Sequence, residues 1–178
     1  YDFHRQNWFN NYAREHHAVR NEVGVFEQSS FSKILVQGRD AEQVLNRLAT
    51  SNMSVPLGTA VYTQFLNQRG GIEADITISR LADDKYMVVA PAFAETHVDA
   101  WIQENIAADE FCLTTNMTAA YALLNVQGPN SRALLSQISN ADLSNDEFPF
   151  GTIREIEIGY QLAYALRISY TGELGWGL

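Results

Sequence analysis

Along this chain, small and apolar residues recur at helical or alternating spacing, which predicts a series of short helices and strands. Residues 13–23 lack Gly and Pro and repeat small or apolar residues at helical spacing, so we expect a helix that stops at Gly24. Residues 33–37 alternate around three aliphatic side chains, which predicts a strand. Asp40 follows and can cap a helix that runs through Leu48.

The middle of the chain has the pattern of a β-hairpin followed by a strand and a helix. Two β-patterned runs, 61–67 and 72–81, are joined by residues 68–71, whose two glycines supply the positive φ values that a tight connection needs. Residues 85–90 predict a further strand. Residues 94–107 predict an amphipathic helix with one apolar side.

The second half of the chain shows a similar order of elements. It predicts a strand over 120–126, a helix opened by Gly128 and Pro129, a loop over 143–151, and an antiparallel pair formed by 153–158 and 162–170. A strand or helix is expected to begin where the sequence ends, so we expect a truncated C-terminus. Hairpins dominate, which favours an α+β fold of antiparallel sheets with flanking helices in two similar lobes.

Composition narrows the class of protein. The 178 residues are 46% hydrophobic and 19% charged, as in a soluble globular protein of one compact domain. The net charge of −9 is scattered along the chain, which disfavours nucleic acid and anionic membrane as partners. Cys112 is the only cysteine and the histidines lack ligand spacing, so neither a disulfide nor a metal site is expected. The compartment stays open between a bacterial cytoplasm and the mitochondrial matrix.

One strand carries the first candidate for chemistry. Alternation over residues 72–79 sends Ile72, Ala74, Ile76 and Ile78 to one face and Glu73, Asp75, Thr77 and Ser79 to the other. If the hairpin loop has an even number of residues, Tyr62 lies on the face of Asp75, directly opposite or diagonal to it. An aromatic ring beside a carboxylate can form a wall for a small molecule, although a solvated sheet face explains the same pattern.

A second candidate lies near the end of the chain. Glu173 follows Tyr170, Thr171 and Gly172, so it projects from a turn at a strand end, where functional side chains are often mounted. An ordinary surface turn explains this position equally well. The chain contains no glycine fingerprint for a dinucleotide, so any flavin domain must lie outside it.

Several blocks together resemble, in order and over nearly the whole chain, the folate-binding domains of the aminomethyltransferase (glycine-cleavage T-protein) family. These blocks are Glu15-His16-His17-Ala18-Val19-Arg20 with Val23-Gly24-Val25-Phe26, Lys33-Ile34-Leu35-Val36-Gln37-Gly38, Tyr62-Thr63, Leu66-Asn67 with Gly70-Gly71-Ile72, Asn125-Val126-Gln127-Gly128-Pro129 and Tyr170-Thr171-Gly172-Glu173.

Within this family, the chain is most similar to the dimethylglycine and sarcosine dehydrogenase branch, whose members are larger flavoproteins. Transferases usually carry a His-Met pair where this chain has Ser30-Phe31, and the opening residues 1–9 resemble the junction segment of that branch. The resemblance implies that 1–178 is an incomplete folate-binding domain. The C-terminal barrel and the upstream FAD domain would then lie outside the chain.

The resemblance also implies roles for four residues and for tetrahydrofolate. Asp75 would steer or deprotonate a folate amine, Tyr62 would border the pterin pocket, Glu173 would hold the pterin ring, and Tyr170 would be a further wall. The T-protein motif has two adjacent aspartates where this chain has Ala74 and Asp75.

Three hypotheses about function follow from the resemblance. The leading one is a folate-dependent module that captures formaldehyde or an iminium, released from a methylated amine on a separate flavin domain, as 5,10-methylenetetrahydrofolate. The second is a free-standing aminomethyltransferase of glycine cleavage. The third is a folate-binding or structural domain without catalysis, which the Ala74 substitution keeps open.

Overall fold

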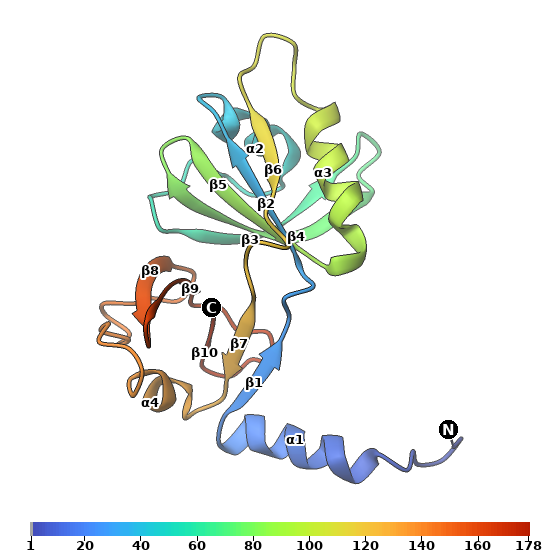
Figure 1. Cartoon of the computed structure of the whole chain (residues 1–178). Coiled ribbons are helices and arrows are strands. Elements are labelled where there is room, and N and C mark those ends of the chain that lie inside the picture. Colours follow the sequence, from blue (N-terminus) through green and yellow to red (C-terminus); the bar gives the residue numbers. More distant parts are fainter. Residues whose placement is uncertain (1) are drawn as a thin grey trace. The chain divides into compact units, whose positions relative to one another are not determined.

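The computed structural model describes residues 2–178 and divides the chain into two compact units, each described by itself (Figure 1). The central unit comprises residues 28–123 and 151–153. The terminal unit comprises residues 2–27, 124–150 and 154–178. Tyr1, the first residue of the junction-like opening, lies outside the described residues.

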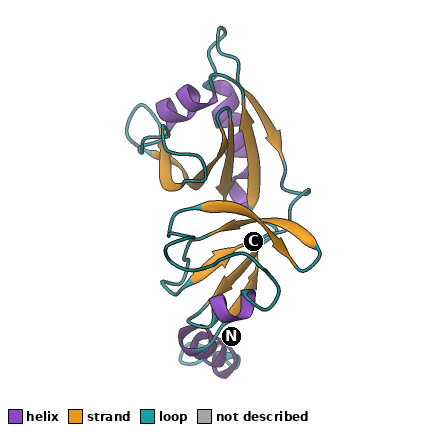
Figure 2. Ribbon diagram, turned by 90° about the vertical axis from the view of Figure 1, so that its left-hand side faces the viewer, coloured by secondary structure: helices purple, strands orange, loops and turns teal. Residues whose placement is uncertain are grey.

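The central unit is a five-stranded antiparallel sheet with two α-helices (Figures 1 and 2). Its strands lie in the order β3-β4-β5-β2-β6. Along the chain the elements are β2 (Ser32–Gln37), α2 (Ala41–Leu48), β3 (Ala60–Leu66), β4 (Ile72–Ala82), β5 (Lys85–Ala90), the 3₁₀ turn η1 (Ala92–Ala94), α3 (Glu95–Glu104) and β6 (Leu113–Asn116). The strands and helices expected over 33–104 are all present, whereas β6 was not predicted.

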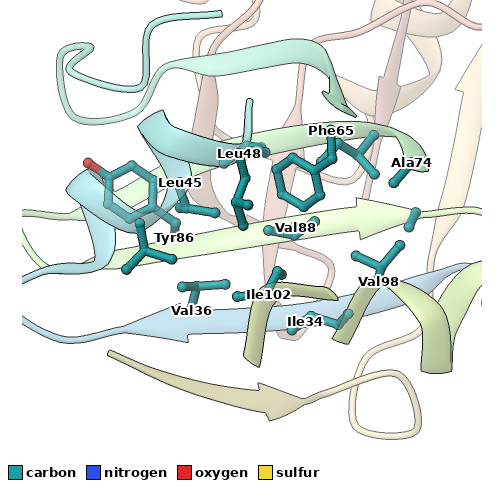
Figure 3. Packing of buried hydrophobic residues seen from close by; sticks show 14 of the residues in the cluster. Ile34, Val36, Leu45, Leu48, Phe65, Ala74, Tyr86, Val88, Val98 and Ile102 are labelled. Carbon is teal, nitrogen blue, oxygen red and sulfur yellow. The ribbon is translucent and has the colours of Figure 1, made fainter. Parts of the chain in front are cut away.

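Apolar residues of alternate strand positions form the core of the central unit beneath α2 and α3. Ile34, Phe65 and Val88 from the sheet are fully buried against Leu45 of α2 and Ile102 of α3 (Figure 3). Period-2 alternation places these strand residues on one face of the sheet, and burial of this face provides most of the driving force for folding of the unit. The opposite face of β3 and β4 therefore carries the polar positions.

The register of the β3–β4 hairpin fixes which residues share that polar face. Gln64 lies opposite Asp75 and Tyr62 lies opposite Thr77. The register shifts between Phe65 and Leu66, so that one residue of β4 is unpaired at the loop end. As a result the expectation for Ile72 is wrong: its side chain is 68% exposed instead of lying with the core-facing positions of β4.

The connection from β2 to α2 requires a glycine. Gly38 has a φ of +137°, and a Cβ atom built on it would lie 2.1 Å from the Phe111 carbonyl oxygen. Asp40 precedes α2 as expected, but its side chain does not cap the helix. Its Oδ2 accepts a hydrogen bond from the Phe111 backbone N–H at 2.7 Å, so the carboxylate fastens a distant loop instead.

The terminal unit is a second five-stranded antiparallel sheet, in the order β1-β7-β10-β9-β8. Trp176 and Phe148 are fully buried at its centre, with ring centroids 6.1 Å apart in an edge-to-face arrangement. Its elements are α1 (Phe9–Asn21), β1 (Gly24–Glu27), β7 (Leu124–Gln127), α4 (Ser131–Leu135), β8 (Ile153–Ile158), β9 (Gln161–Leu166) and β10 (Gly175–Gly177).

Two antiparallel sheets confirm the α+β class, while several boundaries in the terminal unit differ from the expectation. Helix α1 begins four residues earlier than predicted, β7 is confined to Leu124–Gln127, and β9 ends at Leu166 instead of Tyr170. Helix α4 begins at Ser131, after Pro129, and has only five residues. The two sheets do not correspond to two halves of the sequence, because the terminal unit gathers both ends of the chain.

Candidate functional site

Asp75 and Tyr62 lie on the polar face of the β3–β4 hairpin, as the alternation predicted. Asp75 is exposed between two buried residues of β4, Ala74 and Ile76. Since Tyr62 pairs with Thr77, it is diagonal to Asp75 and not directly opposite. The Tyr62 side chain is 62% exposed, so a ring and a carboxylate project together from this face.

Gln64 is a third residue of this face, and it was not among the candidates. Its side-chain Nε2 donates a hydrogen bond to Oδ1 of Asp75 at 3.1 Å. Cross-strand parity could have found it, because Gln64 is the residue directly opposite Asp75. The amide holds one carboxylate oxygen and leaves the carboxylate as an acceptor for a further donor.

Ala74 points away from the candidate site. It is buried in the core of the central unit, where its cross-strand partner is Phe65. A carboxylate at position 74 would therefore face the apolar side of the sheet and could not act on the same face as Asp75. The alanine at this position therefore changes no side chain on the face that carries Asp75.

Glu173 lies in the loop between β9 and β10, directly after Gly172, which has a φ of +83°. Its side chain is 16% exposed and forms an ion pair with Arg20 of helix α1. Tyr170 belongs to the same loop and is 63% exposed. Arg20 could not have been found from the sequence as a partner of Glu173, because 153 residues separate the two.

The four predicted residues divide between the two units. Asp75 and Tyr62 belong to the central unit, where the sheet register brings them onto one face. Tyr170 and Glu173 belong to the terminal unit and share one loop. The roles that the resemblance implies for these four residues stay predictions.

The central unit also has a hollow of about 810 Å³ that contains neither Tyr62 nor Asp75. Its walls come from the end of α2, from the β3–β4 loop and from α3, and include Asn67, Glu73 and Trp101. Glu73 accepts from Nδ2 of Asn67 at 2.7 Å and is paired with Nε2 of His97 at 3.0 Å. These contacts fasten Glu73 to α3, which covers the core-facing side of the sheet, so the expectation that Glu73 shares the face of Asp75 is wrong.

Residues 2–178 contain no group of three or more His, Cys, Asp or Glu side chains placed to hold a metal ion. No helix in this described part of the chain combines the length and the apolar character that a membrane crossing requires.

The fold and the exposed carboxylate define an α+β domain with two antiparallel sheets and a polar hairpin face. Comparison with known proteins gives the family: residues 1–178 match the GCVT N-terminal domain, and the chain belongs to this family.

Relatives of known description are longer than this chain. Over its full length it is 43% identical to 4-methylaminobutanoate oxidase (formaldehyde-forming) of Paenarthrobacter nicotinovorans, and it spans 22% of that protein. Over 90% of its length it is 35% identical to human mitochondrial sarcosine dehydrogenase, of which it spans 19%. The chain thus spans about a fifth of the length of these relatives.

A solved structure has the same fold. The aminomethyltransferase T of the glycine cleavage system from Bartonella henselae superposes with a TM-score of 0.80 at 28% identity, over 92% of this chain and 43% of that one.

Proposed function

We propose that this chain is the tetrahydrofolate-dependent one-carbon transfer module of an FAD-dependent oxidoreductase. It captures formaldehyde or an iminium, released by oxidative N-demethylation of a methylated glycine or related amine, as 5,10-methylenetetrahydrofolate. Family membership supports the binding of tetrahydrofolate. The similarity to an oxidase described as formaldehyde-forming and to sarcosine dehydrogenase supports the link to oxidative N-demethylation. FAD would bind on a domain outside this chain.

The observation that carries the proposal is that the Asp75 carboxylate and the Tyr62 ring are both exposed on the same face of a hairpin whose other face forms the core. Tetrahydrofolate supplies a nucleophilic ring nitrogen when it is bound. Asp75 accepts the proton that a reacting amine must lose, or stabilises a nearby cation electrostatically. Gln64 orients the carboxylate through the bond to Oδ1.

The chemistry of Glu173 supports a role in holding a pterin ring. A pterin edge presents two parallel N–H donors, which a single carboxylate such as that of Glu173 accepts. The ion pair with Arg20 holds the Glu173 carboxylate in place. Each unit also offers an aromatic surface of the kind that a flat heterocycle favours, Tyr170 in the terminal unit and Tyr62 in the central unit.

Single-turnover kinetics of the full-length protein with its methylated amine and tetrahydrofolate test the assignment of Asp75. Asp75→Asn should slow formation of 5,10-methylenetetrahydrofolate by roughly 10²- to 10⁴-fold, because the base is lost. The flavin reduction rate should not change. Asp83→Asn is the matched control, since Asp83 is an exposed acid of the turn that follows the same strand. Equal rates of product formation by Asp75→Asn and the wild type would contradict the role proposed for Asp75.

A second candidate function is folate binding without catalysis, which the missing first aspartate had suggested. The burial of Ala74 weakens this reading, because position 74 faces the core. Calorimetry with tetrahydrofolate separates binding from no binding. Both candidate functions require binding that Glu173→Gln weakens, and the kinetics of Asp75→Asn then distinguish a catalytic domain from one that only binds folate. A free-standing aminomethyltransferase would instead process an aminomethyl group on a lipoyl carrier without any flavin.

A further inference from the structure

Two arginines of the terminal unit lie over the same tryptophan and form no ion pair, although the Asp142 carboxylate is near enough to Arg132 for the two charges to interact. The Cζ atoms of Arg132, in α4, and Arg167, directly after β9, lie 5.7 Å and 5.6 Å from the centroid of the Trp176 ring. Among residues 2–178, the ion pairs involve other residues, and no carboxylate lies within ion-pair distance of either guanidinium. Such a pair of cations is unexpected in a chain with a net charge of −9.

The two guanidinium groups donate only to neutral oxygens. Arg132 donates from Nε to the Leu143 carbonyl at 2.8 Å and from Nη2 to Oδ1 of Asn145 at 2.5 Å. Arg167 donates from Nη2 to the same Asn145 oxygen at 2.8 Å and from Nη1 to the Phe148 carbonyl. One amide oxygen therefore accepts from two cations, which holds two positive charges close together.

Two further donors of this cluster have no acceptor. Nε of Arg167 and Nε1 of Trp176 are buried and lack a hydrogen-bond partner in the described structure. A buried donor without a partner costs free energy. Burial, and after it the charge of Arg132, lowers the pKa of Arg167, so its surroundings disfavour the positive charge. An anion beside the two guanidinium groups would relieve the repulsion between them.

We propose that the cluster of Arg132, Arg167 and Trp176 is a binding site for a small oxyanion, either a carboxylate or a phosphate group. The planar guanidinium fork suits both kinds of oxyanion. None of its three residues is among the four that the proposed function uses, and the site does not depend on the proposed folate function.

Titration of the chain with inorganic phosphate and, separately, with glutarate tests the proposal, with sodium chloride at matched ionic strength as reference. The chain has three tryptophans, so the indole N–H signals in an NMR spectrum can be resolved. The Trp176 signal should shift saturably with at least one of the two anions, whereas those of Trp8 and Trp101 should not. The anion that gives the tighter binding distinguishes a phosphate ligand from a carboxylate ligand.

Variants distinguish an anion site from a purely structural role of the arginines in holding residues 143–148. Arg132→Gln should weaken anion binding by about tenfold or more. Arg154→Gln is the control, since Arg154 lies over the Phe148 ring, 5.2 Å from its centroid, and should bind as the wild type does. If neither anion moves the Trp176 signal of the wild type beyond the effect of chloride, the proposal is wrong, whatever the folding of the variants.

Discussion

Phe65→Ala and Tyr62→Ala form a pair of substitutions that tests the two faces of the β3–β4 hairpin, on which the position of Asp75 depends. Phe65 is fully buried in the core of the central unit, and replacing such a ring by a methyl group costs roughly 3–5 kcal/mol. Tyr62 lies three residues earlier on the opposite face and is 62% exposed. Its replacement should cost about 1 kcal/mol or less.

Amide hydrogen exchange of β4, followed by mass spectrometry, measures these costs within the central unit. It does not require that the two units unfold together. When reclosing outpaces exchange, Phe65→Ala should accelerate exchange of β4 by roughly two to nearly four orders of magnitude, and Tyr62→Ala by less than about tenfold. Equal acceleration by the two substitutions would mean that Tyr62 is a core residue, and the assignment of Asp75 to an open face would be refuted.

Three further predictions concern single residues. The hydrogen bonds from Arg47 lower the pKa of Glu110 to about 2. The contribution of Glu110 to stability is therefore present above pH 4.5 and is lost as the pH falls towards 2. Glu110→Gln should abolish this pH dependence, measured by amide hydrogen exchange of the 105–111 segment. Gly38→Ala should lower the free energy of unfolding by roughly 1–3 kcal/mol or more in a urea titration, because the new methyl group meets the Phe111 carbonyl. Burial raises the pKa of the Cys112 thiol to about 11. At pH 8, iodoacetamide should therefore alkylate this thiol far more slowly in the folded chain than in urea. Equal rates would show that the thiol is accessible in the folded chain.

The periodic patterns in the sequence were sufficient to predict most helices and strands of the central unit. The alternation over 72–79 predicted the side of Asp75, and parity across the hairpin predicted that Tyr62 shares it. Both follow from the period of 2 along a strand, which is a local property of the backbone. The bulge at the loop end interrupts this alternation. As a result, Ile72 is exposed, although its apolar side chain indicated the core-facing side of the strand.

Short elements without internal periodicity could not be predicted. The strand β1, of four residues, exists because it pairs with β7, about one hundred residues later. The strand β6 likewise depends on its pairing with β2. A segment of four residues carries too little pattern to specify a strand, and its partner supplies the hydrogen bonds that stabilise it.

The sequence by itself determined the family, the α+β class and the residue types of the candidate site, because these are properties of residue identity and local spacing. Only the tertiary structure decided that Arg20 pairs with Glu173 and that Arg132 and Arg167 meet over Trp176. Such contacts depend on where distant segments pack. Packing is set by the whole core and not by any single stretch of the chain.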